Sequence, residues 1–302
     1  MNNGKAAKYI VETIAKIIFL ICAVVAIVAV LSITVYMFAK GTPALAKVGV
    51  TDLLFGTAWQ PTAANPTYGI FYIICTSIIG TAVAIAIGVP IGILTAVFIT
   101  EVSNKKIAAI VQPAVELLAA IPSVIYGLLG MMLLNPLMYK LEKHIFAGST
   151  THQFTGGANL LSAIIVLAIM ILPTVINISV SSIRAVPGHM KAASLALGAT
   201  HIQTIFKVMI PAAKSGILAA VILGVGRALG ETMAVMMVVG NQPRVPNSIL
   251  QGVRTLTTNI VMEMGYATDL HREALIATGV VLFAFILIIN LCFSAIKRSG
   301  KE

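Results

Sequence analysis

Residues 160–182 read LLSAIIVLAIMILPTVINISVSS and contain no Asp, Glu, Lys or Arg. A helix needs roughly 20 predominantly apolar residues to cross the hydrocarbon core of a bilayer, whereas a barrel strand needs about half that number. Inside the bilayer the backbone must satisfy its own hydrogen bonds, so helices and closed barrels are the structures that span it. The length of this run therefore predicts a transmembrane helix.

Five other stretches of the chain share this apolar character: residues 17–39, 70–99, 115–138, 216–240 and 274–296. The whole chain is 59% hydrophobic and 10% charged, whereas an average soluble domain carries about 25% charged residues. Because the apolar stretches extend from end to end, we predict a single all-α membrane domain over residues 1–302 with six transmembrane helices.

The first stretch also fits a second class of segment. Lys5, Lys8 and Lys16 precede or begin it, and Ala44-Leu45-Ala46 resembles a signal-peptide cleavage site. However, its apolar core is longer than the roughly 7–15 residues of a signal peptide. We therefore expect residues 17–39 to be retained as a span.

The distribution of Lys and Arg predicts the orientation, because cytoplasmic loops of membrane proteins are enriched in these residues. With the N-terminus in the cytoplasm, the inner segments hold more of the 20 Lys and Arg residues than the outer segments do. We therefore expect a multi-pass protein of the plasma membrane with both termini in the cytoplasm. The same rule accounts for the net charge of +10, so this charge does not indicate nucleic-acid binding.

Three ionisable residues lie inside the predicted spans: Glu116, Arg227 and Glu231. A charge at the centre of a transmembrane helix costs about 2.5–3.5 kcal/mol on insertion scales, so such residues are candidates for a functional site. Glu116 is near the start of its span, where it could instead reach the interface. Arg227 and Glu231 lie four residues apart on one helix face and could pair. A structural role for this pair and a role in a solute pathway both stay open.

The guanidinium of Arg227 is suited to an oxyanion, because its planar fork donates two parallel hydrogen bonds. Glu231 would then balance the cation when the pathway is empty.

Gly226 and Gly230 lie beside these charges, and Gly88 and Gly92 repeat the same Gly-x-x-x-Gly spacing in the second span. Small residues at this spacing predict close contacts between helices.

Residues 183–215 form the longest predicted cytoplasmic segment. A helix is expected over residues 189–197, and Gly198 suits its C-terminal cap. Thr200 and Gln203 have the spacing of a capping box for a second helix, which we expect to end at Pro211. Such a hairpin could carry a peripheral protein, or it could lie on the membrane surface as a connector.

This segment resembles the cytoplasmic signature of ABC-importer permeases: Glu-Ala-Ala, three residues, Gly, nine residues, an aliphatic residue, one residue and Leu-Pro. The matching positions are Ala192-Ala193-Ser194, Gly198 and the stretch from Val208 to Pro211. The family's Glu is replaced by Ala192 and its second Ala by Ser194. Residues 116–127 (ELLAAIPSVIYG) and 226–235 (GRALGETMAV) are similar to phosphate-import permeases, most of all to the PstC type.

The resemblance implies the type I ABC importer (MetI-like) permease fold in a bacterial inner membrane. It also implies a permease subunit of an ATP-driven importer of inorganic phosphate that works by alternating access. The implied partners are a homologous second permease (PstA-like), a cytoplasmic ATPase dimer (PstB-like) and an extracytoplasmic phosphate-binding protein (PstS-like). The implied substrate pathway comprises Arg227, Glu231, Glu116, Ser123 and Thr232. The implied ATPase contact comprises Ala192, Ala193, Ser194, Leu195, Gly198, Ala199, Thr200 and Pro211.

Two alternatives stay open. The permease could carry another oxyanion, such as sulfate, molybdate or phosphonate, or the chain could be a self-sufficient secondary transporter. The sequence contains no GxxxxGK[ST], HExxH or GxSxG motif, which argues against a membrane-embedded enzyme. We therefore predict no catalytic residue, metal site or cofactor in this chain, and expect ATP hydrolysis in a separate partner.

Overall fold

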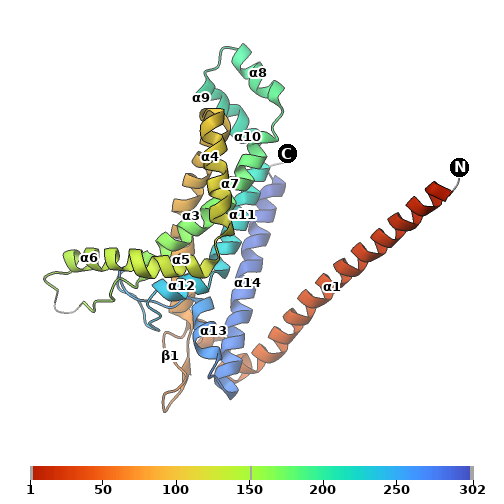
Figure 1. Cartoon of the computed structure of the whole chain (residues 1–302). Helices are drawn as coiled ribbons and strands as arrows, with labels where there is room; N and C mark the ends of the chain where they lie inside the picture. The colour runs from red at the N-terminus through yellow and green to blue at the C-terminus, as the bar shows by residue number, and fades with distance from the viewer. Residues whose placement is uncertain (1–2, 150–151, 300–302) are drawn as a thin grey trace.

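The computed structural model of the chain describes residues 3–149 and 152–299. Its long helices are α1 (Asn3–Val48), α3 (Phe71–Val97), α7 (Leu160–Arg184), α11 (Lys214–Gly230) and α14 (Asp269–Ser299). Figure 1 shows that α3, α7, α11 and α14 run side by side as a bundle, with α7 in contact with both α3 and α11. This bundle is the scaffold on which the shorter elements are arranged.

The shorter elements fall into three groups. One end of the bundle carries α8 (Gly188–Ala196), α9 (His201–Thr204), the π-helical segment η3 (Ile205–Met209) and α10 (Ile210–Ala212). The opposite end carries α2 (Val50–Phe55), the antiparallel strands β1 (Trp59–Gln60) and β2 (Thr67–Tyr68), and α13 (Leu256–Met264). The remaining elements are η1 (Phe98–Val102), α4 (Lys105–Ala120), α5 (Ser123–Leu129), η2 (Gly130–Leu134), α6 (Asn135–Ile145) and α12 (Met233–Val238).

Helices α3 and α7 lie close together because glycines of α3 stand where the two helices meet. A Cβ added to Gly88 would lie 2.7 Å from Cδ1 of Ile171, and one added to Gly92 would lie 2.7 Å from Cγ1 of Val175. Carbon atoms in favourable contact are about 3.5–4.0 Å apart, so neither position has room for a side chain. The predicted packing role is confirmed for Gly88 and Gly92, but it is wrong for Gly226 and Gly230, where an added Cβ would meet no neighbouring helix within 4 Å in the described chain.

Gly92→Val is expected to lower the melting temperature of the purified protein in detergent, because overpacking a tight contact costs about 1–3 kcal/mol. The matched control is Gly226→Ala, since a Cβ added to Gly226 or Gly230 meets no described atom within 4 Å. The control should melt at or slightly above the wild-type temperature, because Ala favours helix over Gly. A wild-type melting temperature for Gly92→Val would contradict the close contact between α3 and α7.

The single helix expected over residues 115–138 is divided in two. Helix α4 ends at Ala120, Ile121 is extended with φ −69° and ψ 126°, and α5 begins at Ser123. Pro122 is the cause, because a proline disfavours the helical conformation at the residue before it. Figure 1 shows that α4 runs along the bundle, whereas α5 and α6 lie across it.

The helix expected over residues 216–240 is divided in the same way. Helix α11 ends at Gly230, Glu231 is extended with φ −69° and ψ 128°, and α12 begins at Met233. A Cβ added to Gly127 in α5 would lie 2.8 Å from Cα of Ala234 in α12. The segments that follow the two breaks therefore pack against each other.

Within residues 3–149 and 152–299, five helical segments are long and apolar enough to cross a membrane: Val11–Val48, Phe71–Val102, Ser123–Ile145, Leu160–Arg184 and Asp269–Cys292. A sixth arises if His201–Ala212 and Lys214–Gly230, which are bent by 71°, form one span. Helix α1 stands apart, because its most apolar part is not buried against the rest of the described chain. Figure 1 shows it meeting α14 at one end and diverging from the bundle at the other.

Candidate functional site

Arg227 lies in the last turn of α11 and points at α7. Its Nη1 donates a hydrogen bond of 3.1 Å to Oγ1 of Thr174, and the side chain is half-buried. One cation is therefore held between α11 and α7.

Glu231 does not pair with Arg227, which corrects the expectation drawn from their spacing. Its Oε1 accepts hydrogen bonds from the backbone amides of Thr232, at 3.2 Å, and Ala234, at 3.1 Å. The carboxylate thus caps the free amides at the start of α12, a favourable position for an anion. Residues four apart share a face only within one helix, and the helix ends at Gly230.

A small polar cavity of about 20 Å³ lies beside Glu231, at the break between α11 and α12. Its polar lining comes from Glu231 and from the hydroxyl-bearing residues Thr76, Ser77, Thr81, Thr255 and Thr257. The hydroxyl of Thr257 donates a hydrogen bond of 3.0 Å to the carbonyl of Glu231. The cavity holds about one water molecule, so it is too small for a four-oxygen anion in this conformation.

The other predicted pathway residues divide between two places. Thr232 lies within the second break, where its hydroxyl bonds the carbonyl of Gly230 at 3.2 Å, and Ser123 is the first residue after the first break. Glu116 is exposed on α4 and accepts a hydrogen bond of 3.1 Å from Gln112, which in turn accepts one of 2.8 Å from Arg184. Glu116 therefore belongs to a polar chain that ends at the last residue of α7.

The predicted hairpin is present between α7 and α11. Helix α8 spans Gly188–Ala196, close to the expected residues 189–197, and Gly198 has a positive φ of 83°. The capping box is confirmed: Thr200 N donates to Oε1 of Gln203 at 2.9 Å, and Gln203 N donates to Oγ1 of Thr200 at 3.2 Å. The hydroxyls of Ser194 and Thr204 lie 2.9 Å apart and hold the two helices together.

The second helix of the hairpin ends next to Pro211, as expected. The helical run continues through η3 into α10 and ends at Ala212, and the helix that follows from Lys214 is bent by 71° from it. The π-helical turn supplies the change of register, since Ile210 N bonds the carbonyl of Ile205.

The hairpin presents an apolar surface at its tip. The side chain of Leu197 is 89% exposed, and Ile202 and Phe206 are also exposed, whereas Ile205 and Met209 are buried. The predicted coupling residues that are exposed are Ala192, Ala193, Leu195, Gly198, Thr200 and Pro211, while Ser194 and Ala199 are half-buried. One side of the hairpin rests on the bundle, and the other is free within the described chain.

Two buried ionic clusters lie toward the end of the bundle opposite the hairpin, and neither was predicted from the sequence. In the first, the carboxylate of Glu263 forms an ion pair with Arg254, lies 2.8 Å from Nε2 of His271 and accepts a hydrogen bond of 2.9 Å from Nε1 of Trp59. Trp59 packs edge-on against Tyr68 with ring centroids 5.9 Å apart, and burial raises the pKa of Tyr68. These residues are too far apart in the chain for any spacing rule to join them.

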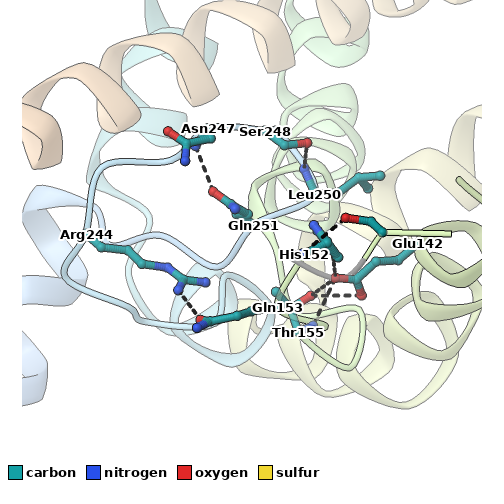
Figure 2. Close-up of polar contacts among 10 residues, drawn as sticks. Glu142, His152, Gln153, Thr155, Arg244, Asn247, Ser248, Leu250 and Gln251 are labelled. Carbon is teal, nitrogen blue, oxygen red and sulfur yellow. Dashed lines mark hydrogen bonds and ion pairs between the residues drawn. The ribbon is translucent and has the colours of Figure 1, made fainter. Parts of the chain in front are cut away.

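The second cluster surrounds Glu142, whose side chain is fully buried (Figure 2). Its Oε1 lies 2.8 Å from Nε2 of His152 and accepts a hydrogen bond of 2.9 Å from the amide of Thr155. Figure 2 also shows Arg244 bonded to Gln153, which joins the loop after α12 to the loop after α6. Among the residues that the structure describes, no group of three or more His, Cys, Asp or Glu side chains is placed to hold a metal ion.

Known proteins resemble this chain over most of its length. It matches the family described as "Binding-protein-dependent transport system inner membrane component" over residues 88–299. It is 38% identical to the probable ABC transporter permease protein YqgH of Bacillus subtilis, over 92% of this chain and 90% of that protein. It is 34% identical to the phosphate transport system permease protein PstC of Xylella fastidiosa, over 91% of this chain and 88% of that protein.

A solved structure has a similar arrangement of helices. The inward-facing MetNI methionine ABC transporter superposes with a TM-score of 0.53, over 77% of this chain and 94% of that chain. The two sequences are 20% identical. The helical arrangement is therefore shared although most side chains differ.

Proposed function

Because the chain belongs to the family of binding-protein-dependent transport system inner membrane components, we propose that it is the permease subunit of an ATP-driven importer of inorganic phosphate. The expected MetI-like permease fold is confirmed by the similarity to MetNI. The resemblance drawn from residues 116–127 and 226–235 is confirmed by PstC relatives that align along most of the chain. The chain is thus a membrane subunit of an ABC transporter.

The observation that supports an anion site is the bonding of Arg227. Within the described chain its guanidinium has no carboxylate partner, and its hydrogen bond goes to the neutral hydroxyl of Thr174. The remaining N–H groups of the fork can donate to an oxyanion, and such charge-assisted hydrogen bonds are roughly twice as strong as neutral ones. An anion at Arg227 would also neutralise a charge that is costly within a membrane.

Transport requires this site to open alternately to the two sides. The cavity beside Glu231 is too small for phosphate, so α11 and α12 must separate from their neighbours before the anion passes. The hydroxyls of Ser123 and Thr232, at the two breaks, then become further donors. Glu231 stays bonded to the amides of α12 and repels an anion that lingers at Arg227.

The partners follow from the family and from the exposed surfaces. A cytoplasmic ATPase dimer binds the hairpin through Leu197 and the exposed coupling residues around it. A homologous second permease completes the pathway, and an extracytoplasmic phosphate-binding protein delivers the anion. This arrangement places both termini and the hairpin in the cytoplasm; the structure has the start of α1, the hairpin and the end of α14 toward the same end (Figure 1).

Reconstitution tests this function. The chain would be co-expressed with a second permease and an ATPase, purified as a complex and placed in liposomes with phosphate-loaded binding protein. We expect uptake of radiolabelled phosphate that requires ATP. Uptake that survives removal of the ATPase would identify a secondary transporter, and uptake of sulfate, molybdate or phosphonate without phosphate would identify a permease for another oxyanion.

A further inference from the structure

A partly buried ion pair joins the hairpin to the bundle. Nζ of Lys191 in α8 lies 2.6 Å from Oε2 of Glu101 in η1, the π-helical end of α3. The side chain of Glu101 is 8% exposed and that of Lys191 is 33% exposed. The function proposed above uses neither residue.

This pair is the polar attachment of α8 to the bundle. Helix α8 contains no buried residue, so apolar packing holds it weakly. Its other described side-chain hydrogen bond, between Ser194 and Thr204, stays inside the hairpin. Of the described side-chain hydrogen bonds of α8, the one from Lys191 is thus the one that reaches a helix of the bundle.

The ion pair of Lys191 and Glu101 is expected to stay formed. A carboxylate with little access to water depends on its cation, and removing one partner of such a pair leaves a charge that is poorly compensated. The short contact and the low exposure of Glu101 fit this condition. If the pair stays formed when the hairpin moves, η1 moves with α8. A π-helical turn of this kind is frequently found at functional sites.

Helix α3 can transmit this movement to α7 and α11, because the three helices are in close contact. A Cβ added to Gly92 would lie 2.7 Å from Cγ1 of Val175, and one added to Gly224 in α11 would lie 3.2 Å from Cγ2 of the same residue. The side chain of Val175 therefore packs closely between α3 and α11. The residue before it, Thr174, holds the guanidinium of Arg227.

We propose that the ion pair of Lys191 and Glu101 is the link that transmits movement of the ATPase-bound hairpin to α3, and through α7 to Arg227. The inference rests on the proposed function, because it requires an ATPase on the hairpin and a transported anion at Arg227. Both are positioning residues, since neither touches the anion. Their loss should uncouple ATP hydrolysis from transport.

The test measures ATP hydrolysis and phosphate uptake together, in the reconstituted complex with phosphate-loaded binding protein. The variants are Lys191→Met, Glu101→Gln, the conservative Lys191→Arg, and the charge exchange Glu101→Lys with Lys191→Glu. We expect phosphate transported per ATP to fall about fivefold or more in each neutralised variant, the lower end of typical coupling between sites. Lys191→Arg and the charge exchange should recover most of that loss.

The control is a second ion pair at the opposite end of the bundle, in which Nζ of Lys47 lies 3.0 Å from Oε2 of Glu273. Lys47→Met and Glu273→Gln should leave phosphate transported per ATP unchanged. An unchanged ratio in Lys191→Met and Glu101→Gln would overturn the proposal, as would equal losses of hydrolysis, transport and complex yield, which indicate a purely structural pair. A wild-type complex that hydrolyses ATP without moving phosphate would instead overturn the proposed function.

Discussion

Arg227→Ala is expected to slow phosphate uptake about 25-fold or more, because losing one partner of a desolvated ionic hydrogen bond costs about 2–5 kcal/mol and about 1.4 kcal/mol is a factor of ten. The yield of assembled complex should stay at the wild-type level. The described protein partner of Arg227 is the neutral hydroxyl of Thr174, so the substitution leaves no buried carboxylate unpaired.

Two matched variants separate charge from geometry at this position. Arg227→Lys keeps the cation but loses the planar fork, so its uptake should lie between those of the wild type and Arg227→Ala. Thr174→Val keeps the guanidinium but removes its neighbour, and should cause a smaller loss. Initial rates of radiolabelled uptake in proteoliposomes measure all three. Wild-type uptake by Arg227→Ala would contradict an anion contact at Arg227.

Leu197→Glu is expected to weaken binding of the ATPase to the permease about 25-fold or more, because an apolar anchor at the centre of an interface contributes about 2 kcal/mol or more and a buried glutamate would lack a partner. Folding of the permease should be unaffected, since the side chain of Leu197 is 89% exposed at the tip of the hairpin. The dissociation constant of the purified ATPase for the permease in detergent measures the effect.

The control for this prediction is Ile249→Glu. Ile249 is also exposed, but it lies in the loop between α12 and α13, at the end of the bundle opposite the hairpin. Its substitution should leave ATPase binding unchanged. Equal dissociation constants for Leu197→Glu and the wild type would show that the ATPase does not use the hairpin tip, whatever the two complexes transport.

Local chemistry made several elements predictable from the chain itself. Apolar runs become helices because a backbone without water must bond within its own segment. The capping box of Thr200 and Gln203 and the turn at Gly198 were predicted because each depends on residues within one helical turn. The glycines of α3 were recognised as packing positions because small residues let helices approach.

The candidate site was predictable as a set of residues but not as a geometry. Arg227 and Glu231 stand out because charges are expensive in an apolar run, and this signal does not depend on the rest of the fold. Their separation arises because Glu231 leaves the helix and caps α12 instead. After the break α12 packs against α5, and this contact joins segments that are distant in sequence.

The sequence by itself thus determined which long apolar segments are mainly helical, where the hairpin turns and which charges are candidates for transport, because these properties depend on neighbours along the chain. The tertiary structure alone decided which charges meet. The carboxylate of Glu101 lies against Lys191, and that of Glu263 lies against Trp59 and His271. Such partners are chosen when whole helices and loops pack, so no pattern within one segment can specify them.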